Sequence, residues 1–338
     1  MRSGHAARLV ALASTRVVGR RVLISTIEVS VSAAAQATRS EPDSPPVATT
    51  RPHGARALSR ACRPRQWSKN GLLLAAPLAG GVLDQAHVAL AAAGAIVAFC
   101  MLSSATYLLN DVRDVESDRL HHRKRLRPIA AGDLSIRAAL AAALVLAVGG
   151  LVLAAVIRPQ FALVGLGYLA LTAAYSLWLR HVIVADILAI AAGFVLRAAA
   201  GAAATDVAPS RWFLVVTSCA AIFVVAGKRH AELFGSARDG LTRATLRRYS
   251  ERALLVLLAA AAAGTVAAYA VWAFRRPEDG PWYEATIIPV VLWLGRYGSL
   301  VARGAGEAPE DLILADRALL GLTVTWIALF LGGMYAGR

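Results

Sequence analysis

The stretch Asn110-Asp111-Val112-Arg113-Asp114-Val115-Glu116-Ser117-Asp118 places an amide and several carboxylates where a long apolar segment ends. On one α-helix, at about 100° per residue, Asn110, Asp111, Asp114 and Asp118 fall within about 100° of one another. Like charges on one helix face repel each other unless a cation lies between them. Oxygen ligands of this kind suit Mg²⁺, which usually also binds substrate phosphates. The stretch therefore predicts a metal-bridged diphosphate at a membrane surface, with Asp111, Asp114 and Asp118 as metal ligands and Asn110 as a substrate contact.

A solvated acidic helix end is the structural alternative for these residues. Two observations weigh against it. Glu116 points about 240° round the helix from Asn110, away from the acidic face. The following residues, 121–128, then place dense positive charge, including Arg127, directly beside the negative charge. A site for Mg²⁺ and a polyphosphate needs both signs of charge, so we expect Arg127 to contact substrate.

The composition is that of a polytopic membrane protein. The chain has 338 residues, of which 57% are hydrophobic and 17% charged, with a mean hydropathy of +0.56. Its Ala-rich segments suit close helix packing in lipid, and β-barrel alternation is absent. We therefore predict an all-α bundle of about nine transmembrane helices, at roughly residues 70–84, 86–109, 135–156, 160–179, 183–204, 211–228, 252–274, 283–302 and 312–335.

Charge in the loops predicts the orientation of the bundle. With a cytoplasmic N-terminus, almost all Lys and Arg between the spans lie on the inside, and only Arg158, Arg211, Arg275 and Arg276 lie outside. We thus expect a multi-pass plasma-membrane protein with its acidic site facing the cytoplasm. The net charge of +15 fits anionic lipid and phosphate ligands rather than nucleic acid, because the basic residues lie in short inter-helix loops. The scattered cysteines Cys62, Cys100 and Cys219 predict neither disulfides nor a zinc site.

The first part of the chain differs from the rest. Residues 1–57 are basic and contain no apolar run long enough to span a membrane, so we predict a mostly disordered extension before a transmembrane domain at 58–338. At the start of the first span, Trp67 is typical of an interfacial anchor. Lys69 and Asn70 stand at the same boundary, and a phosphate contact is an equally good interpretation for both.

Two further polar groups lie at predicted inside boundaries. Tyr175 and Arg180 precede Asp186, a carboxylate at the start of an apolar helix. An aromatic belt with a positive-inside arginine explains the first two but not Asp186, because ionisable residues within a span usually mark function or a buried pair. Arg197, about 16 Å deeper on the same face, could serve either purpose. Lys228 and Arg229, at the end of another span, are candidate phosphate contacts.

The motifs resemble the UbiA superfamily of intramembrane prenyltransferases, which are nine-helix bundles with an Asn-Asp-x-x-Asp-x-x-x-Asp stretch like that at 110–118. Over roughly residues 56–335 the chain is also similar to one branch, the decaprenyl-phosphate phosphoribosyltransferases. It departs from that branch at Arg180, where the branch has Lys, and residues 1–57 have no counterpart. The closer resemblance is carried by residues 63–67 with Lys69-Asn70, by 107–116 and 125–132, by Gly227-Lys228-Arg229 with Ala231-Glu232, and by Glu310-Asp311.

The resemblance implies Mg²⁺-dependent transfer of a 5-phosphoribosyl group from 5-phosphoribosyl 1-diphosphate to a polyprenyl phosphate such as decaprenyl phosphate, for cell-wall arabinan precursors. Asp111, Asp114 and Asp118 would be the catalytic metal ligands. Ordinary superfamily members carry a second acidic motif, and its reduction here to Asp186 favours the branch. Two alternatives stay open: a prenyltransferase acting on an aromatic or quinone acceptor, and a transporter of anionic metabolites. The sequence is compatible with a homo-oligomer.

Overall fold

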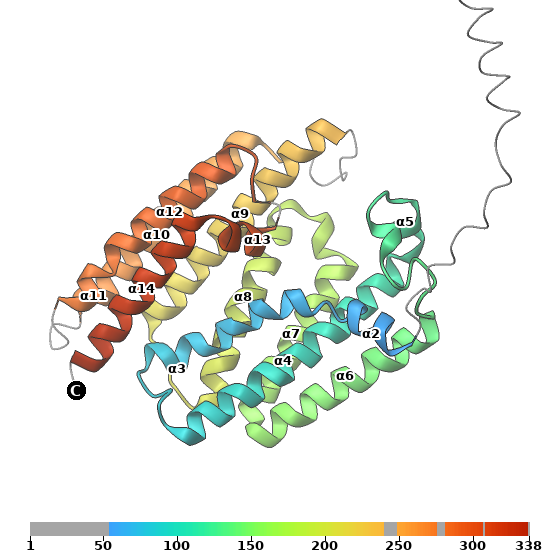
Figure 1. Cartoon of the computed structure of the whole chain (residues 1–338), viewed down its shortest axis with the longest axis horizontal. Helices are drawn as coiled ribbons and strands as arrows, with labels where there is room; N and C mark the ends of the chain where they lie inside the picture. The colour runs from blue at the N-terminus through green and yellow to red at the C-terminus, as the bar shows by residue number, and fades with distance from the viewer. Residues whose placement is uncertain (1–53, 240–248, 276–280, 307, 337–338) are drawn as a thin grey trace, which may run out of the picture. The chain divides into compact units, whose positions relative to one another are not determined.

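The computed structural model describes residues 54–239, 249–275, 281–306 and 308–336, and within these ranges every regular element is a helix. Long helices form the body of the bundle, and short ones connect them or lie at either end (Figure 1). The short ones are α2 (Ala55–Ala61), η1 (Pro64–Leu74), α3 (Ala75–Ala79), α5 (Val115–Leu120), η2 (Lys124–Leu126), η3 (Leu179–His181), α11 (Trp282–Ala285) and α13 (Pro309–Ala315). The long ones are α4 (Ala86–Arg113), α6 (Ile136–Ile157), α7 (Pro159–Leu177), α8 (Ile183–Thr205), α9 (Arg211–Asp239), α10 (Glu251–Phe274), α12 (Ile287–Ala302) and α14 (Arg317–Ala336).

Eight helical stretches in the described part of the chain are long and apolar enough to cross a membrane. They correspond to the predicted spans from 86–109 onward, so the prediction of a polytopic α-helical membrane protein is confirmed. The predicted first segment, 70–84, differs. It falls on the end of η1 and on α3, neither of which has membrane-spanning length, and the chain turns at Gly80 and Gly81 before α4.

Close backbone contact fixes η1 against the bundle. A Cβ atom added to Gly201 of α8 would lie 1.9 Å from the carbonyl oxygen of Leu73, so only glycine allows η1 to approach α8 this closely. Leu73 itself is fully buried among side chains of α4, α7 and α8. Because Lys69 and Asn70 precede Leu73 on η1, this contact also fixes the position of two predicted site residues.

The hydrophobic interior is built in two regions joined by α8 and α9. In one, α4 packs extensively on α6, around a cluster that includes Phe99, Leu102 and Phe161. In the other, α9 packs on α10 and α12 on α14, around Phe223, Leu258 and Tyr297. The first group runs from teal to green and the second from yellow to red in Figure 1. Many outward-facing residues of the spans are large and apolar, as a lipid environment requires.

The predicted N-terminal extension, 1–57, falls almost wholly outside the described residues. Only its last residues are described, and α2 begins there at Ala55. Its disorder therefore stays a prediction. Ala57 and Ala61 of α2 are buried beside Leu108 of α4, so the helical domain includes residues just before its predicted start at 58.

Candidate functional site

The acidic stretch lies at the end of α4, but it is not one continuous helix. α4 ends at Arg113, Asp114 adopts φ −91° and ψ 8°, and α5 begins at Val115. Two backbone hydrogen bonds cross this break, from the amide of Asp114 to the Asn110 carbonyl (2.9 Å) and from the amide of Asp118 to the Asp114 carbonyl (2.8 Å). The predicted uninterrupted helix is thus wrong at one residue, while the helical spacing of the polar groups largely persists.

Two of the carboxylates converge on one arginine. Nη1 of Arg127 donates to Oδ1 of Asp111 at 3.1 Å and to Oδ2 of Asp118 at 2.6 Å. Both aspartates are only 2% exposed, whereas the side chain of Glu116 is 81% exposed and pairs with Arg119 instead. The contrast agrees with the predicted shared face and with the predicted opposite direction of Glu116.

A second guanidinium reaches Asp111 from the start of η1. Nη2 of Arg63 donates to Oδ1 of Asp111, and the guanidinium lies 5.2 Å from the ring centroid of Tyr107. Arg63 adopts φ 53°, a left-handed conformation that is costly for residues other than glycine. The contacts with Asp111 and Tyr107 stabilise this turn, which places the Arg63 guanidinium against the acidic stretch.

The donor set at Asp111 fits Mg²⁺. Among the described residues no group of three or more His, Cys, Asp or Glu side chains could by itself hold a metal ion. Oδ2 of Asp111, however, is buried without a hydrogen-bond partner in the described part of the chain, so one carboxylate oxygen remains available to a cation. Mg²⁺ is often bound by one or two carboxylates together with substrate phosphates and water, which matches this arrangement.

The remaining groups of the stretch face the end of α7. Nη1 of Arg180 lies 3.2 Å from both carboxylate oxygens of Asp114. The Ser176 hydroxyl donates to Oδ1 of Asn110 at 2.5 Å, and Arg113 donates to the Ser176 carbonyl. The predicted residues Asn110, Asp114 and Arg180 are therefore brought together.

Asp186 lies in a separate, closed network. Arg229 reaches it with Nη2 at 2.7 Å from Oδ1, and Tyr175 donates to the same oxygen at 3.0 Å. Tyr249 donates to the other oxygen at 3.1 Å, and burial together with the Asp186 charge raises the pKa of Tyr249. Arg229 also pairs with Glu232. The structure thus places Tyr175, Asp186 and Arg229 together, and Asp186 already has three partners.

Lys69 takes part in a third polar group. Its Nζ lies 2.5 Å from Oε1 of Gln66 and 3.3 Å from Oε1 of Glu310, while Nε2 of Gln66 donates to Glu310 at 2.9 Å. Burial lowers the pKa of Lys69, and the Glu310 charge partly opposes that shift. α13 therefore supplies the carboxylate that stabilises this ammonium group.

Asn70 turns into the bundle rather than toward the acidic stretch. It is fully buried, and its amide nitrogen lies 3.3 Å from Sγ of Cys100. Its Oδ1 accepts a hydrogen bond from Nε of Arg197 at 3.1 Å. Arg197, for which the sequence left two interpretations open, is thus part of a buried network. Cys62, Cys100 and Cys219 are free thiols, as predicted.

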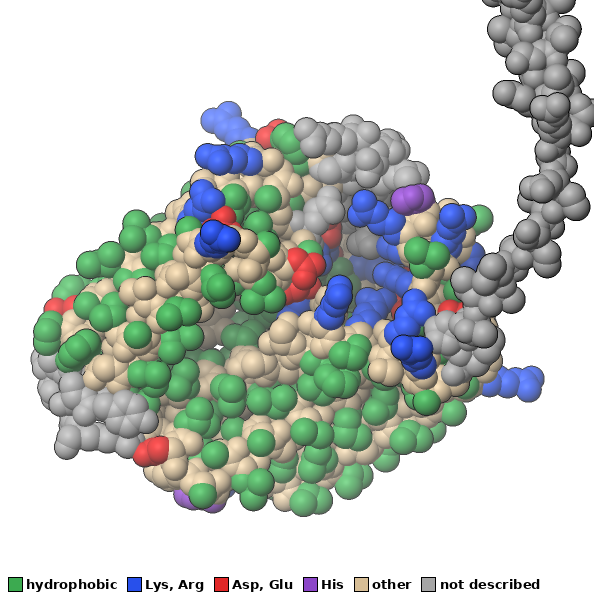
Figure 2. All heavy atoms as spheres, viewed as in Figure 1, with side chains coloured by type: hydrophobic (Ala, Val, Ile, Leu, Met, Phe, Trp, Pro, Cys, Tyr) green, Lys and Arg blue, Asp and Glu red, His purple; other side chains and the backbone are tan. Residues whose placement is uncertain are grey.

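Charged side chains gather toward one side of the face seen in Figure 2. In Figure 2 basic and acidic side chains cluster near α2, α5 and α13, whereas most of the rest of this face is hydrophobic. Lys228, half-buried on α9, has no ion pair or hydrogen bond within the described residues. The end of the bundle that carries the acidic stretch is therefore also its most densely charged region.

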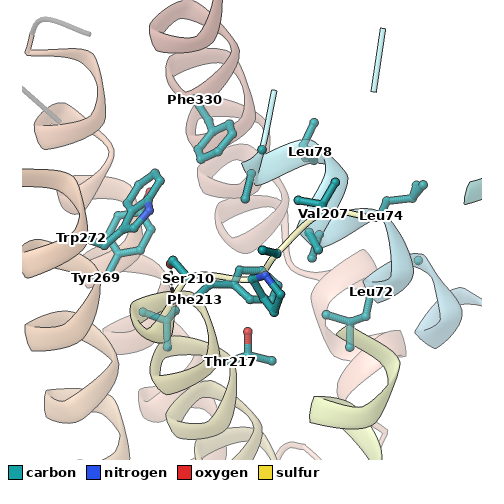
Figure 3. Close-up of a pocket in the computed structure, with 18 of the residues that line it drawn as sticks. Leu72, Leu74, Leu78, Val207, Ser210, Phe213, Thr217, Tyr269, Trp272 and Phe330 are labelled. Carbon is teal, nitrogen blue, oxygen red and sulfur yellow. Dashed lines mark hydrogen bonds between the residues drawn. The ribbon is translucent and has the colours of Figure 1, made fainter. Parts of the chain in front are cut away.

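An apolar cavity of about 530 Å³ lies between η1, α3, α9, α10 and α14. Figure 3 shows Leu72, Leu74 and Leu78 on one side of it, with Tyr269 and Trp272 of α10 opposite. The lining also includes residues from the loop between α8 and α9, which lies at the helix ends opposite the acidic stretch. An elongated apolar group would fit such a lining.

Several residues of these networks were absent from the predicted site, and Arg63, Tyr249 and Glu310 are the charged or phenolic groups among them with the most direct contacts to it. Arg63 and Glu310 belong to motifs that carry the family resemblance, and that resemblance could have identified them as site residues. Tyr249 had no signal beyond its place after a basic loop. Their partners lie 48, 63 and, for Glu310 and Gln66, 244 residues away in sequence, so local spacing could not reveal these contacts.

Residues 71–320, about three-quarters of the sequence, match the sequence profile of the UbiA prenyltransferase family. The chain belongs to the UbiA prenyltransferase family. A relative from Mycobacterium tuberculosis, named decaprenyl-phosphate phosphoribosyltransferase, is 42% identical over 80% of this chain and 91% of its own. Proteins of the same name from Mycolicibacterium smegmatis and Corynebacterium glutamicum are 40% and 38% identical over 82% of this chain, and over 92% and 86% of their own lengths. This UbiA protein is accordingly a transferase embedded in the membrane.

Solved structures show the same fold. A UbiA homologue from Archaeoglobus fulgidus, bound to GPP and Mg²⁺, superposes with a TM-score of 0.61 and 19% identity, over 83% of this chain and 99% of the other. A second structure of it, bound to DMAPP and Mg²⁺, gives 0.62 and 20% over 83% and 98%. At this identity the likeness establishes the fold of the UbiA protein and leaves its substrates to be argued from its own residues.

Proposed function

We propose that this UbiA protein transfers the 5-phosphoribosyl group of 5-phosphoribosyl 1-diphosphate to a polyprenyl phosphate such as decaprenyl phosphate, releasing pyrophosphate. The observation that carries the proposal is the meeting of Asp111 and Asp118 on Arg127 beside a free, buried oxygen of Asp111. The site thus offers carboxylate oxygen for a cation and guanidinium groups for phosphate. The names of three relatives at 38–42% identity support the same donor and acceptor.

The state of Asp186 favours this reaction over isoprenoid transfer to an aromatic acceptor. Binding a prenyl diphosphate through two metal sites requires a second acidic group that can reach a cation. Asp186, the candidate for that role, is 4% exposed and occupied by Arg229, Tyr175 and Tyr249. One acidic stretch then serves one diphosphate, and the single phosphate of the lipid must be met by cationic side chains.

Asp111, Asp114 and Asp118 would hold Mg²⁺ against the diphosphate of the donor, where Mg²⁺ supplies charge neutralisation for the leaving group. Arg63, Arg127 and Arg180 already lie against these carboxylates and would neutralise further negative charge as it grows on pyrophosphate. Their charge is fixed, so they need no reorganisation during the reaction.

In the proposed reaction the bond between ribose C1 and the diphosphate oxygen breaks, and pyrophosphate leaves with the electron pair. An oxygen of the lipid phosphate forms the new bond to C1. A phosphate monoester has a second pKa of about 6, so it is largely ionised at neutral pH and needs no general base. In-line attack inverts the α donor to a β-phosphoribosyl lipid, and catalysis rests on positioning and charge stabilisation.

We further propose that this site faces the cytoplasm. The acidic stretch, the Lys69 group and the start of α10 lie at the same helix ends, where the basic residues of the sequence concentrate. The sugar diphosphate donor is a charged metabolite that is available on that side. The phosphoribosyl lipid would then serve as a precursor for cell-wall arabinan donors.

The test is incubation of purified protein and Mg²⁺ with ribose-labelled 5-phosphoribosyl 1-diphosphate and decaprenyl phosphate. We expect label to enter the lipid phase only when both Mg²⁺ and decaprenyl phosphate are present. Absence of transfer, together with product formation from a polyprenyl diphosphate and an aromatic acceptor, would reject the proposed donor and acceptor and support the alternative prenyltransferase.

A further inference from the structure

Lys69 of η1 and two basic residues from other elements lie near one another, and one carboxylate of the described residues contacts this group. Lys69 belongs to η1, Arg197 to α8 and Lys228 to α9. Glu310 contacts Lys69 at 3.3 Å, but within the described ranges no carboxylate lies within 4.0 Å of Arg197 or Lys228. This group, which we name the η1 basic site, therefore carries an excess of positive charge beside η1.

The buried member of the η1 basic site is Arg197, which is 7% exposed. Its hydrogen bonds go to neutral oxygens: Oδ1 of Asn70 at 3.1 Å, the Gly193 carbonyl at 3.0 Å and the Tyr168 hydroxyl at 2.9 Å. The guanidinium also lies 4.9 Å from the centroid of the Tyr168 ring. These contacts hold the cation in place but do not cancel its charge, and a buried charge without a counter-ion is costly. An anion bound nearby would lower that cost.

The packing of α9 brings Lys228 to the same place. A Cβ on Gly306, in the segment leading to Glu310, would lie 3.8 Å from the Gly227 carbonyl oxygen and 3.6 Å from the Ala231 side chain. The turn of α9 that carries Lys228 therefore packs against the segment before α13. Lys228 is close enough to Lys69 that its charge contributes to lowering the pKa of Lys69. Two ammonium groups held near each other bind a shared anion well.

We propose that Lys69 and Lys228, with the buried charge of Arg197 behind them, bind the phosphate of the polyprenyl phosphate acceptor. This inference rests on the proposed function and assigns the second of its two substrates. It leaves Arg63, Arg127 and Arg180 to the donor diphosphate, because those three side chains contact the acidic stretch.

The apolar cavity favours a lipid as the source of this phosphate. Gly71, Leu72 and Leu74 line the cavity and follow Lys69 directly on η1. On α9, Thr217 lines the cavity, and Lys228 lies about 16 Å further along the helix at 1.5 Å per residue. Both η1 and α9 thus carry residues that line the apolar cavity and, elsewhere on the same helix, a lysine ammonium group. A polyprenyl phosphate uses both features, whereas the 5-phosphate of the soluble donor would use only the lysines.

The test compares Lys69→Met and Lys228→Met with Arg137→Met, which removes an exposed charge at the start of α6. Each lysine variant should raise KM for decaprenyl phosphate about 10-fold or more, since a charge-assisted contact is lost. KM for 5-phosphoribosyl 1-diphosphate should stay close to that of the unsubstituted protein, and Arg137→Met should change neither constant. Lys228→Arg, which keeps the charge, should recover part of the lost acceptor affinity.

A binding measurement without turnover separates this inference from the proposed function. Decaprenyl phosphate, but not decaprenol, should raise the unfolding temperature of the detergent-solubilised protein, and the lysine variants should lose that phosphate-dependent rise. That result supports the η1 basic site even if label transfer fails. If instead the variants keep the rise, or if only KM for the soluble donor increases, the lysines do not bind the lipid phosphate and the inference is overturned.

Discussion

Nη2 of Arg229 donates to Oδ1 of Asp186 at 2.7 Å, and the two side chains are 4% and 5% exposed. This buried pair joins α8 to α9, and Tyr175 and Tyr249 complete its hydrogen bonds. The pair therefore links the packing of α8 and α9 through two buried, opposite charges.

Breaking this pair on one side should destabilise the protein strongly. Asp186→Ala leaves the Arg229 charge buried without its main partner and should cost about 3–5 kcal/mol in the free energy of unfolding. The double variant Asp186→Ala, Arg229→Met removes both charges and should recover a large part of that loss. Thermal unfolding in detergent measures both effects, and equal stability of the single and double variants would contradict the argument.

The acidic stretch should be needed for turnover but not for folding. Asp111→Asn and Asp118→Asn should each lower kcat by about 100-fold or more, because charge stabilisation of the leaving group is lost. Both aspartates contact arginines that remain about a third exposed, so no deeply buried cation is left unpaired. Glu116→Gln is the matched control, since Glu116 is on the same stretch but exposed. Comparable losses in all three variants would refute the assignment.

Arg180 should tolerate replacement by lysine better than loss of charge. It contacts both oxygens of Asp114 through one nitrogen, at 3.2 Å each, rather than through a two-nitrogen fork. Arg180→Lys should therefore change KM for the donor less than about 10-fold, and Arg180→Met should change it more. Steady-state kinetics at saturating decaprenyl phosphate distinguish the two. A larger defect for the lysine variant than for the methionine variant would contradict this.

Acceptor binding should weaken in alkaline solution. Burial lowers the pKa of Lys69 below 10.5, so the ammonium loses its proton earlier than a free lysine does. As the pH increases, KM for decaprenyl phosphate should therefore begin to rise before pH 10.5 is reached. Glu310 raises the pKa of Lys69, so in Glu310→Gln this rise should begin at a lower pH. A pH profile of KM in the two proteins is the measurement, and an unshifted or oppositely shifted profile would disprove the coupling.

The effect of Lys69 on the stability of the folded state has the opposite pH dependence to its effect on acceptor binding. Its folded pKa is lowered, so between that value and 10.5 the unfolded chain binds more protons than the folded chain. Its contribution therefore makes the folded state more stable as pH rises through that window. A weaker acceptor affinity at alkaline pH should then not coincide with Lys69-driven unfolding, and thermal unfolding over the same pH range checks this.

The close approach of η1 to α8 should make Gly201 intolerant of a side chain. Gly201→Ala places a Cβ 1.9 Å from a backbone oxygen, so η1 or α8 must shift, at a cost of about 1–3 kcal/mol. Gly167→Ala is a suitable control, because an added Cβ there meets no atom within 4 Å. The unfolding temperature should fall in the first variant and not in the second. Equal unfolding temperatures would mean that η1 is not held by this contact.

Sequence periodicity predicted those features that depend on neighbouring residues. Eight membrane helices follow from apolar runs of sufficient length, and the shared face of Asp111 and Asp118 follows from helical spacing. The break at Asp114 lay beyond that reasoning, because it depends on how one residue ends α4. The first predicted span also differed, because it falls on η1 and α3, and the close packing of η1 on Gly201 is a contact between distant residues.

Pairings between distant residues could not be predicted from spacing at all. Arg63 reaches Asp111 from the strained turn that begins η1, and Lys69 meets Glu310 because the fold brings α13 beside Gln66 and Lys69 of η1. The partners of Asp186 are likewise distant in sequence, because they come from α7, α9 and the segment just before α10. Its predicted substrate contact stays a prediction.

The proposed reaction breaks the bond between ribose C1 and the diphosphate oxygen, and a donor carrying two labels tests this directly. The protein, Mg²⁺ and decaprenyl phosphate are incubated with 5-phosphoribosyl 1-diphosphate labelled with ¹⁴C in ribose and with ³²P in the terminal phosphate of the diphosphate. We expect ¹⁴C to enter the lipid phase while an equal amount of ³²P is released as water-soluble pyrophosphate. Entry of ³²P into the lipid, or retention of ¹⁴C in the aqueous phase, would contradict the proposed reaction.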